Sequence, residues 1–277
     1  MTLIIALKWL MGEQEAVVIG SDSRATYGPI TYEVKKIYPI YLTHDGEEVD
    51  LAVAGGAGDS SLAKYGYTLA ESILKEQCKQ KGFRCLTYDE FGTAVEEIES
   101  KLISKFNALR KEGIEPSFQM ILASVDPAGK ASMYVFDDRG LAEPVHADPG
   151  FALIGRGAAT GGMLITRLLG YSIEESGNLD LGMLLAFVID LVSEVDPTVG
   201  PFVGESFRMW IAEGKVTMGP LKTEALKEYK TKVEQRENLI RLLQKVCDQE
   251  KSKEKQIEKY LERLLNRAAR SSGARNG

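Results

Sequence analysis

The sequence predicts an α+β domain built in layers, with its strands and helices gathered into separate groups along the chain. Three observations support this fold class. Residues 2–56 contain four apolar runs rich in β-branched side chains. Residues 59–111 instead repeat apolar side chains at helical spacing. The change from strands to helices then occurs once more before a final pair of strands, whereas a parallel βαβ sheet would alternate the two at every step.

The first strands are expected at "TLIIALKW" (2–9), "EAVVIGSD" (15–22), "KKIYPIYL" (35–42) and "VDLAVAGG" (49–56). The first helix is expected over 59–80, because an N-cap cluster, Asp59-Ser60-Ser61, precedes a stripe of apolar residues. The second helix is expected over 88–111, where Asp89 near the start suits the helix dipole.

The second half of the chain repeats the pattern. Strands are expected at "SFQMILASVD" (117–126), "ASMYVFDD" (131–138) and "GFALIG" (150–155). Two helices then fit "AATGGMLITRLLG" (158–170) and "LDLGMLLAFVIDLVSEVD" (179–196). A last strand pair fits "ESFRMWIAEG" (205–214) and "KVTMGP" (215–220).

The end of the chain differs from the rest in charge. Residues 222–277 hold 15 Lys/Arg against 9 Asp/Glu, a net +6, so the remainder carries −12 to give the overall −6. We therefore expect a boundary near 220, with domains at 1–220 and 221–277. Leu221 to Ser272 contains no Gly or Pro, and steps of seven from Leu226 and Tyr229 meet mostly apolar residues. This pattern predicts a long C-terminal helix or helical hairpin, packed on its own domain or against another subunit or partner.

Composition and glycine patterns exclude several functions. The chain of 277 residues is 44% hydrophobic and 27% charged, which is typical of a globular protein of one or two domains. No apolar run reaches about 18 residues and no signal-like start is present, so we expect no membrane span and a cytoplasmic protein. "GRGAATGG" (155–162) has Thr160 where a dinucleotide loop needs glycine, and "AGGAGDSS" (54–61) lacks the end of a phosphate loop.

We also expect no cofactor and no metal, because no Cys/His cluster has zinc spacing. Cys78 and Cys85 are expected to be reduced thiols, with a disulfide as the alternative. The acidic body argues against nucleic-acid binding, despite the basic end "NRAARSSGARNG".

Thr2 directly follows the initiator methionine. A threonine hydroxyl is a poor nucleophile until a base removes its proton, and the free N-terminal amine of the same residue can serve as that base. Such an amine has a pKa of about 7.7–8.0, so a large neutral fraction exists at neutral pH. Because threonine is small, we expect Met1 to be removed and Thr2 to be exposed. The alternative is that Thr2 is only a strand residue at a ragged end.

Three motifs accompany Thr2 in order: "GSDSRAT" (20–26), "KKIYPI" (35–40) and "AVAGGAGD" (52–59). Together they resemble the proteasome β-subunit family of N-terminal nucleophile hydrolases, over about residues 2–220. The resemblance implies a four-layer αββα sandwich, to which the C-terminal helix is added. It also implies a threonine peptidase or amidohydrolase that acts on peptide bonds through a Thr2 acyl-enzyme.

The resemblance assigns catalytic roles to five residues. Thr2 would be the nucleophile, and the charge of Lys36 would favour its alkoxide. Asp22 would orient and charge that lysine. The N–H of Gly55 would form the oxyanion hole, and Asp196 matches a second acid of the family.

The resemblance also implies how a peptide would bind. The backbone at Thr26 and Ala57 would hold an extended peptide by strand addition. Val53 would form the floor of the first specificity pocket and favour a medium apolar side chain. The structural alternatives are a strand-end ion pair for Asp22 and Arg24, and a solvated face for Lys36.

The sequence departs from the family at both accessory serines. Arg156 and Val199 stand where the family has them, and Pro201 replaces a glycine. Thr198 could replace one lost hydroxyl, while Arg156 could repel the Lys36 ammonium or bind a substrate carboxylate. A proteasome-like transpeptidase, similar to the archaeal connectases, and an inactive scaffold are therefore alternatives to the peptidase. We expect a peptide or protein substrate and a homo-oligomer, since family members usually form rings.

Overall fold

The computed structural model describes residues 2–27, 30–147, 149–203 and 205–220, together with 228–229, 231–233, 235, 238–240 and 242. The side chains of residues 26, 27, 30–32 and 168 lie outside this description. The chain divides into two compact units, Met1–Lys230 and Thr231–Gly277.

The first sheet has five antiparallel strands in the order β10-β1-β2-β11-β12. Its strands are β1 (Ile4–Met11), β2 (Gln14–Ser21), β10 (Phe151–Ile154), β11 (Ser206–Ala212) and β12 (Lys215–Pro220). In β1 and β2 the apolar runs are buried on both faces, which explains why they are continuous rather than alternating. The register places Ile4 opposite both Ser21 and Ile154, so the start of β1 lies beside the end of β2.

The second sheet is also antiparallel, in the order β5-β6-β7-β8-β9. Its strands are β5 (Ile37–His44), β6 (Glu47–Gly58), β7 (Phe118–Val125), β8 (Ala131–Phe136) and β9 (Ala142–Pro144). Gly55 of β6 lies opposite Ile37 of β5 and Ile121 of β7. The start of β5 is therefore next to the glycine-rich end of β6.

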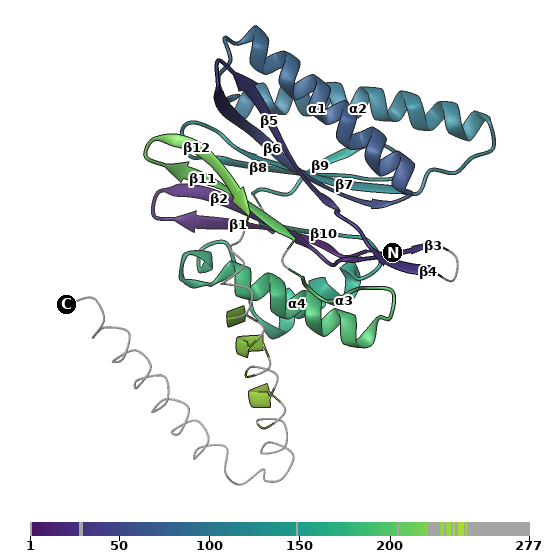
Figure 1. The fold of residues 1–277 in the computed structure, drawn as a ribbon, viewed down its shortest axis with the longest axis vertical. Helices are drawn as coiled ribbons and strands as arrows, with labels where there is room; N and C mark the ends of the chain where they lie inside the picture. Colours follow the sequence, from purple (N-terminus) through teal and green to yellow (C-terminus); the bar gives the residue numbers. More distant parts are fainter. Residues whose placement is uncertain are drawn as a thin grey trace. The chain divides into compact units, whose positions relative to one another are not determined.

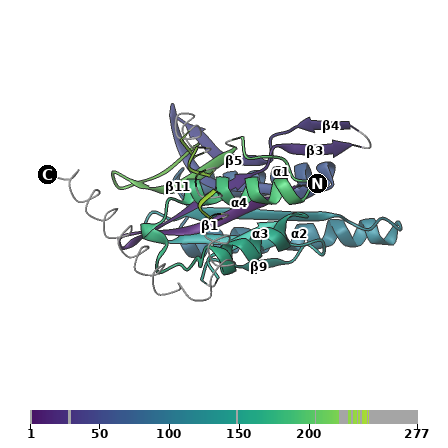
Figure 2. The ribbon, with the colours of Figure 1, turned by 90° about the horizontal axis from the view of Figure 1, so that it is seen from below.

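A separate hairpin of β3 (Arg24–Tyr27) and β4 (Ile30–Glu33) extends away from the two sheets (Figure 2). The sequence analysis did not predict these strands. Each is four residues long, and "RATY" and "ITYE" lack a long apolar run that would mark them.

Helices cover the outer face of each sheet (Figure 1). α1 (Ser60–Gln80) and α2 (Tyr88–Lys111) pack on the second sheet, and α3 (Ala158–Met163) and α4 (Leu181–Val195) pack on the first. A π-helical turn, η1 (Leu164–Leu168), continues α3, and a 3₁₀ turn, η2 (Ser176–Asn178), precedes α4. Asp59 and Thr87 cap α1 and α2 by accepting hydrogen bonds from backbone N–H groups.

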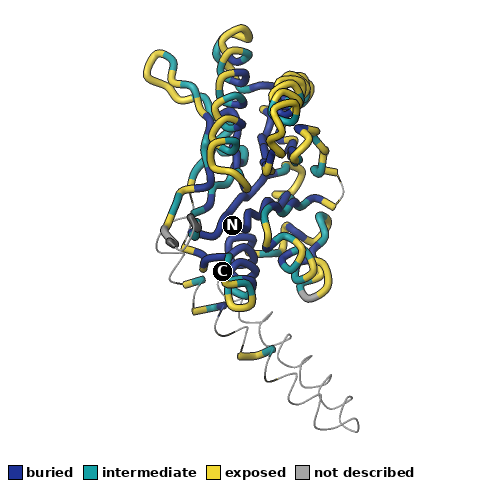
Figure 3. The backbone as a smooth tube through the Cα atoms, turned by 90° about the vertical axis from the view of Figure 1, so that its right-hand side faces the viewer, coloured by how far each residue is buried: buried dark blue, intermediate teal, exposed yellow. Residues whose placement is uncertain are grey.

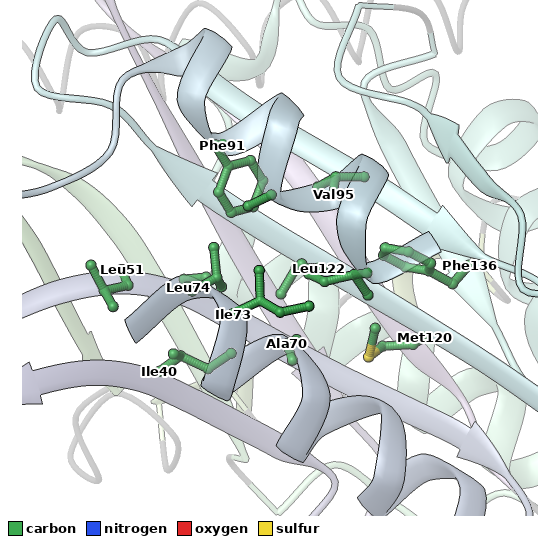
Figure 4. Close-up of a cluster of buried hydrophobic side chains, with 14 of the residues drawn as sticks. Ile40, Leu51, Ala70, Ile73, Leu74, Phe91, Val95, Met120, Leu122 and Phe136 are labelled. Carbon is green, nitrogen blue, oxygen red and sulfur yellow. The ribbon is translucent and has the colours of Figure 1, made fainter. Parts of the chain in front are cut away.

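The core has two described parts. One lies between the sheets and includes Ile4, Ile19, Ile37, Val53 and Ile121. The other lies between α1, α2 and the second sheet, where side chains such as Ile73, Phe91 and Leu122 meet (Figure 4). In Figure 3 the strands between the layers are mostly dark blue and the outward faces of the helices yellow. Burying an aliphatic or aromatic side chain contributes about 1.5–3 kcal/mol, so these layers hold the sheets in register.

The predicted fold class, an α+β sandwich that continues into a long C-terminal helix or helical hairpin, is wrong. The described residues form a mixed α/β architecture with two five-stranded antiparallel sheets and short helices, and they include no long C-terminal helix. The seven-residue pattern in the sequence is interrupted by charged residues, since Arg236, Glu250 and Glu254 occupy positions on the expected seam. A seven-residue spacing does not establish a helix by itself, because helices depend mainly on buried apolar surface for their stability. Most of the predicted tail, 221–277, lies outside the described residues.

Two smaller expectations can be compared with the described part of the chain. Within it, no helix combines the length and apolar character needed to cross a membrane. Cys78 and Cys85 are both free thiols, as predicted. Cys78 of α1 is buried in the core, and the Cys85 thiol donates to the carbonyl oxygen of Asp50 at 3.3 Å.

Candidate functional site

A buried ion pair forms the centre of the candidate site. Asp22 follows the last residue of β2 and is fully buried, and Lys36 precedes β5 and is 5% exposed. The Nζ atom of Lys36 lies 2.6 Å from Oδ1 of Asp22. The two residues come from different sheets, so the pair depends on how the sheets face each other. The structure thus brings together the two residues predicted to act as lysine and orienting acid.

Asp22 accepts three more hydrogen bonds, all from backbone N–H groups. Leu3 donates to Oδ1 at 2.8 Å, and Arg24 and Gly200 donate to Oδ2 at 3.0 and 2.8 Å. The carboxylate is therefore held from four directions and cannot rotate without losing contacts. A buried charge is tolerated when it is paired and hydrogen-bonded in this way.

Burial lowers the pKa of the Lys36 ammonium. The negative charges of Asp22 and Glu205 act in the opposite direction, whereas Arg24 adds to the lowering. The ammonium also donates to the backbone carbonyl oxygen of Arg24 at 2.6 Å. Lys36 is consequently a cation fixed in position, and its protonation is sensitive to the neighbouring charges.

Thr2 is connected to the Asp22–Lys36 pair by the peptide bond that follows it in the chain. The Leu3 N–H that donates to Asp22 belongs to the peptide bond joining Thr2 to Leu3, and it uses the same Oδ1 atom as Lys36. Thr2 is 7% exposed. Its carbonyl oxygen would be 2.1 Å from a Cβ added at Gly155, whose φ is +89°. Only glycine allows the loop after β10 to approach Thr2 so closely.

Thr2 also lines a cavity of about 810 Å³. Arg156 lines it as well, together with three acidic residues, Asp59, Glu115 and Asp138. On one side of this cavity the Gly155 N–H donates to the side-chain oxygen of Gln119 at 2.8 Å. The cavity is large enough for several residues of a peptide, and Thr2 forms part of its wall.

The predicted residues of β6 lie beside the site but face inward. Val53, Gly55 and Ala57 are buried, and they alternate onto the face that meets the first sheet. A Cβ at Gly55 would lie 2.9 Å from Ile4 and 3.1 Å from both Ile19 and Ile37. None of the three residues is among those lining the cavity at Thr2. Packing therefore accounts for Gly55, while its oxyanion role stays a prediction.

Asp196 and its neighbours form a second polar group at the end of α4. The Thr198 hydroxyl donates to Oδ1 of Asp196 at 2.6 Å, and the Thr198 N–H donates to the same atom at 2.9 Å. These bonds, with a smaller effect from the charge of Arg156, lower the pKa of Asp196. Val199, in the place of the family serine, is fully buried. Thr26 lies in β3 opposite Thr31, and its side chain is outside the described part.

Sequence reasoning missed one residue that touches Lys36 directly. Glu205 accepts hydrogen bonds from the N–H groups of Lys36 and Ile37, at 2.5 and 2.8 Å. It belongs to "VGESF", which matches no catalytic motif. The only available signal was an acidic residue at the start of the strand predicted over 205–214, and such residues are common on surfaces.

Comparison with known proteins adds no further assignment: the sequence matches no protein-family model and no curated protein. Within the described residues, no group of three or more His, Cys, Asp or Glu side chains could hold a metal ion. At the site, the amide that follows Thr2 is hydrogen-bonded to the carboxylate of a fixed ammonium–carboxylate pair. Such a pair can stabilise negative charge that develops on the hydroxyl oxygen.

Proposed function

We propose that this chain cleaves peptide or amide bonds through Thr2, after removal of Met1 makes Thr2 the N-terminal residue. One observation carries the proposal: a single buried carboxylate oxygen of Asp22 binds both the Lys36 ammonium, at 2.6 Å, and the amide that follows Thr2, at 2.8 Å. This arrangement ties the position of the hydroxyl-bearing residue to that of the cation. An ion pair with a purely structural role would not need to lie beside the one threonine that can become N-terminal.

The reaction follows from these groups. Oγ1 of Thr2 attacks the substrate carbonyl carbon while its proton passes to the α-amine of the same residue. The positive charge of Lys36 stabilises the alkoxide, and Asp22 holds that charge in place. The C–N bond then breaks, and the leaving amine takes the proton from the α-ammonium. The ester on Thr2 is hydrolysed by water, which restores the hydroxyl and releases a carboxylic acid.

The oxyanion of the intermediate needs a hydrogen-bond donor, and the resemblance gives that role to the Gly55 N–H. Loss of such a donor costs about 3–4 kcal/mol of transition-state stabilisation. Asp196 and the Thr198 hydroxyl are proposed to replace the missing serine of the family by hydrogen bonding near the Thr2 amine. The backbone at Thr26 and Ala57 is proposed to hold the peptide, with Val53 beneath its side chain.

Transpeptidation is the second candidate function. The observation that supports it is the presence of Arg156 at the cavity. Arg156 replaces a serine of the hydrolase pattern and lines the cavity with Thr2. If a peptide amine attacks the Thr2 ester in place of water, a new amide bond forms and no acid is released. The third reading is an inactive scaffold, in which Arg156 and Val199 mark a lost site.

Product analysis separates these three readings. The purified protein is incubated with a peptide library, with and without an excess of one acceptor peptide, and the products are identified by mass. Hydrolysis predicts cleaved peptides in both samples, whereas transpeptidation predicts joined peptides that depend on the acceptor. The Thr2→Ala variant should give neither product, since it removes the nucleophile and little buried area. A wild-type protein that folds normally and gives neither product supports the scaffold.

Assembly and location are also proposals. We infer a homo-oligomer in the cytoplasm, with residues 221–277 available for a contact with another subunit or a partner. Light scattering on the full chain and on a chain ending at Lys230, where the first compact unit ends, tests the contribution of the tail. Two monomeric samples would contradict self-association.

A further inference from the structure

Glu205 lies immediately before β11, and its side chain ends at the start of β5. Oε1 accepts hydrogen bonds from two consecutive backbone N–H groups, those of Lys36 at 2.5 Å and Ile37 at 2.8 Å. Oε2 accepts a third bond, from the Ser21 hydroxyl at 3.0 Å. The backbone carbonyl oxygen of Glu205 also accepts from the Ser21 N–H at 3.0 Å.

These contacts join the two sheets at the candidate site. Ser21 ends β2 and Glu205 precedes β11, both in the first sheet, whereas Lys36 and Ile37 begin β5 in the second. Ser21 is also the residue next to Asp22. One carboxylate therefore holds the backbone of the lysine and the strand end that carries its acidic partner.

We propose that Glu205 is a positioning residue, which fixes the backbone of Lys36 and helps to keep its ammonium charged beside Asp22. The effect of Glu205 on the reactivity of Thr2 rests on the function proposed above, whereas its effect on the position of Lys36 does not. Lys36 is held at three points: Glu205 binds its N–H, its carbonyl oxygen accepts from the Gly56 N–H at 3.3 Å, and Asp22 binds Nζ. Without the hydrogen bonds to Glu205, the backbone at the start of β5 can shift.

The charges around Lys36 give the direction of the electrostatic effect. Asp22 at the end of β2 and Glu205 before β11 are negative, and Arg24 of β3 is positive. A nearby negative charge favours the ammonium, so loss of the Glu205 charge lowers the pKa of Lys36. If the ammonium assists Thr2, the alkaline limb of the rate against pH then moves to lower pH.

The test uses two substitutions that separate the effect of the Glu205 charge from the effect of its side-chain length. Glu205→Gln keeps the length and one acceptor oxygen but removes the charge, whereas Glu205→Asp keeps the charge on a shorter side chain. The readouts are the rate at which a peptide epoxyketone labels Thr2, as a function of pH, and the titration of Lys36. The second is followed by NMR of the lysine Cε–H groups, with the Lys36 signal assigned by its absence in Lys36→Met.

A matched control is available far from the site. Glu15 of β2 also joins the sheets through its carboxylate, which accepts from the Ala131 N–H at 2.8 Å and pairs with Lys8 at 2.6 Å. Glu15→Gln should affect folding in a similar way, yet leave both the labelling rate and the Lys36 titration unchanged.

We expect Glu205→Gln to move the Lys36 midpoint and the alkaline limb to lower pH, and Glu205→Asp to slow labelling by about 10–100-fold with a smaller change in the midpoint. A wild-type Lys36 midpoint in a folded Glu205→Gln protein overturns the proposal. Absence of labelling in the wild type contradicts the function of Thr2 instead, and the Lys36 titration then decides the role of Glu205 by itself.

Discussion

At the scale of single residues, the Asp22–Lys36 pair is not symmetrical. The Asp22 carboxylate keeps three backbone N–H donors when Lys36 is removed, whereas the Lys36 ammonium loses its only charged hydrogen-bond partner when Asp22 is neutralised and keeps the neutral carbonyl oxygen of Arg24. Leaving a buried charge without its partner typically destabilises a protein by about 3–5 kcal/mol. Replacing Asp22 and replacing Lys36 should therefore lower the free energy of unfolding by different amounts.

We predict that Asp22→Asn lowers the free energy of unfolding by about 3 kcal/mol, and that Lys36→Met lowers it by clearly less. Both values come from urea unfolding monitored by circular dichroism. Equal losses, or a larger loss for Lys36→Met, would show that the backbone donors do not stabilise the Asp22 carboxylate as described.

Gly55 offers a second test at this scale, because the space around it is filled by Ile4, Ile19 and Ile37. Gly55→Ala should destabilise the fold by about 1–3 kcal/mol, since an added methyl group overfills a packed core. The matched control is Gly162→Ala in α3, where the nearest atom is 4.0 Å away and the change should be neutral or slightly stabilising. Thermal unfolding of the two variants compares them; an equally stable Gly55→Ala would contradict the packing.

The Asp22–Lys36 pair was predicted through the resemblance of "GSDSRAT" and "KKIYPI" to motifs of the N-terminal nucleophile hydrolases. The sequence could not predict Glu205, whose role arises from a contact between the start of β5 and the loop before β11. The closeness of Gly155 to Thr2 is of the same kind, since those residues lie far apart in the chain. Long-range contacts between sheets leave no local pattern.

At the scale of elements, the start of α2 combines a capping box with an ion pair. Thr87 and Glu90 bond each other's backbone N–H groups, and Arg84 pairs with Glu90 at 2.7 Å. The hydrogen bonds from Arg84 and from the Thr87 N–H are the main reasons why the pKa of Glu90 falls to about 2. Because the folded-state pKa lies below the unfolded one, this stabilisation is complete above about pH 4.5 and is lost as the pH falls toward 2.

We predict that Glu90→Gln lowers the unfolding free energy by about 1 kcal/mol at neutral pH and that the difference from wild type disappears toward pH 2. Glu97→Gln is the control on the same helix, because the Glu97–Lys101 pair is about half exposed and should contribute a few tenths of a kcal/mol. Denaturant unfolding at several pH values measures both. A Glu90→Gln difference that persists at low pH would contradict the assignment.

Element boundaries were predictable where apolar spacing and a cap occurred together. The predicted helix at 88–111 coincides with α2, and the one at 59–80 with α1 and its cap. The β3–β4 hairpin was not predicted because the sequences of its strands, "RATY" and "ITYE", contain no continuous apolar run. The predicted helix at 158–170 is divided between α3 and the π-helical turn η1, a change in backbone bonding that side-chain spacing does not reveal.

At the scale of the whole molecule, the position of Thr2 depends on both sheets at once. Thr2 lies just before β1 of the first sheet, Lys36 lies just before β5 of the second, and Asp22 binds the chain at both places. The fold class was mispredicted because a seven-residue spacing over 221–277, most of which lies outside the described residues, was taken by itself to indicate a long helix. The layered part was more predictable, since each sheet strand with a long apolar run has to be buried.

The central claim, that Thr2 acts with its own amine beside Lys36, is tested most directly by labelling. The wild-type protein is treated with a peptide epoxyketone, which needs both the hydroxyl and the free amine of an N-terminal threonine, and is then examined by intact and peptide mass spectrometry. We predict loss of Met1 and one adduct at Thr2, with no adduct in Thr2→Ala and a strongly reduced amount in Lys36→Met. Retention of Met1 throughout the sample, or a folded wild type with a free Thr2 that remains unlabelled, would contradict the claim.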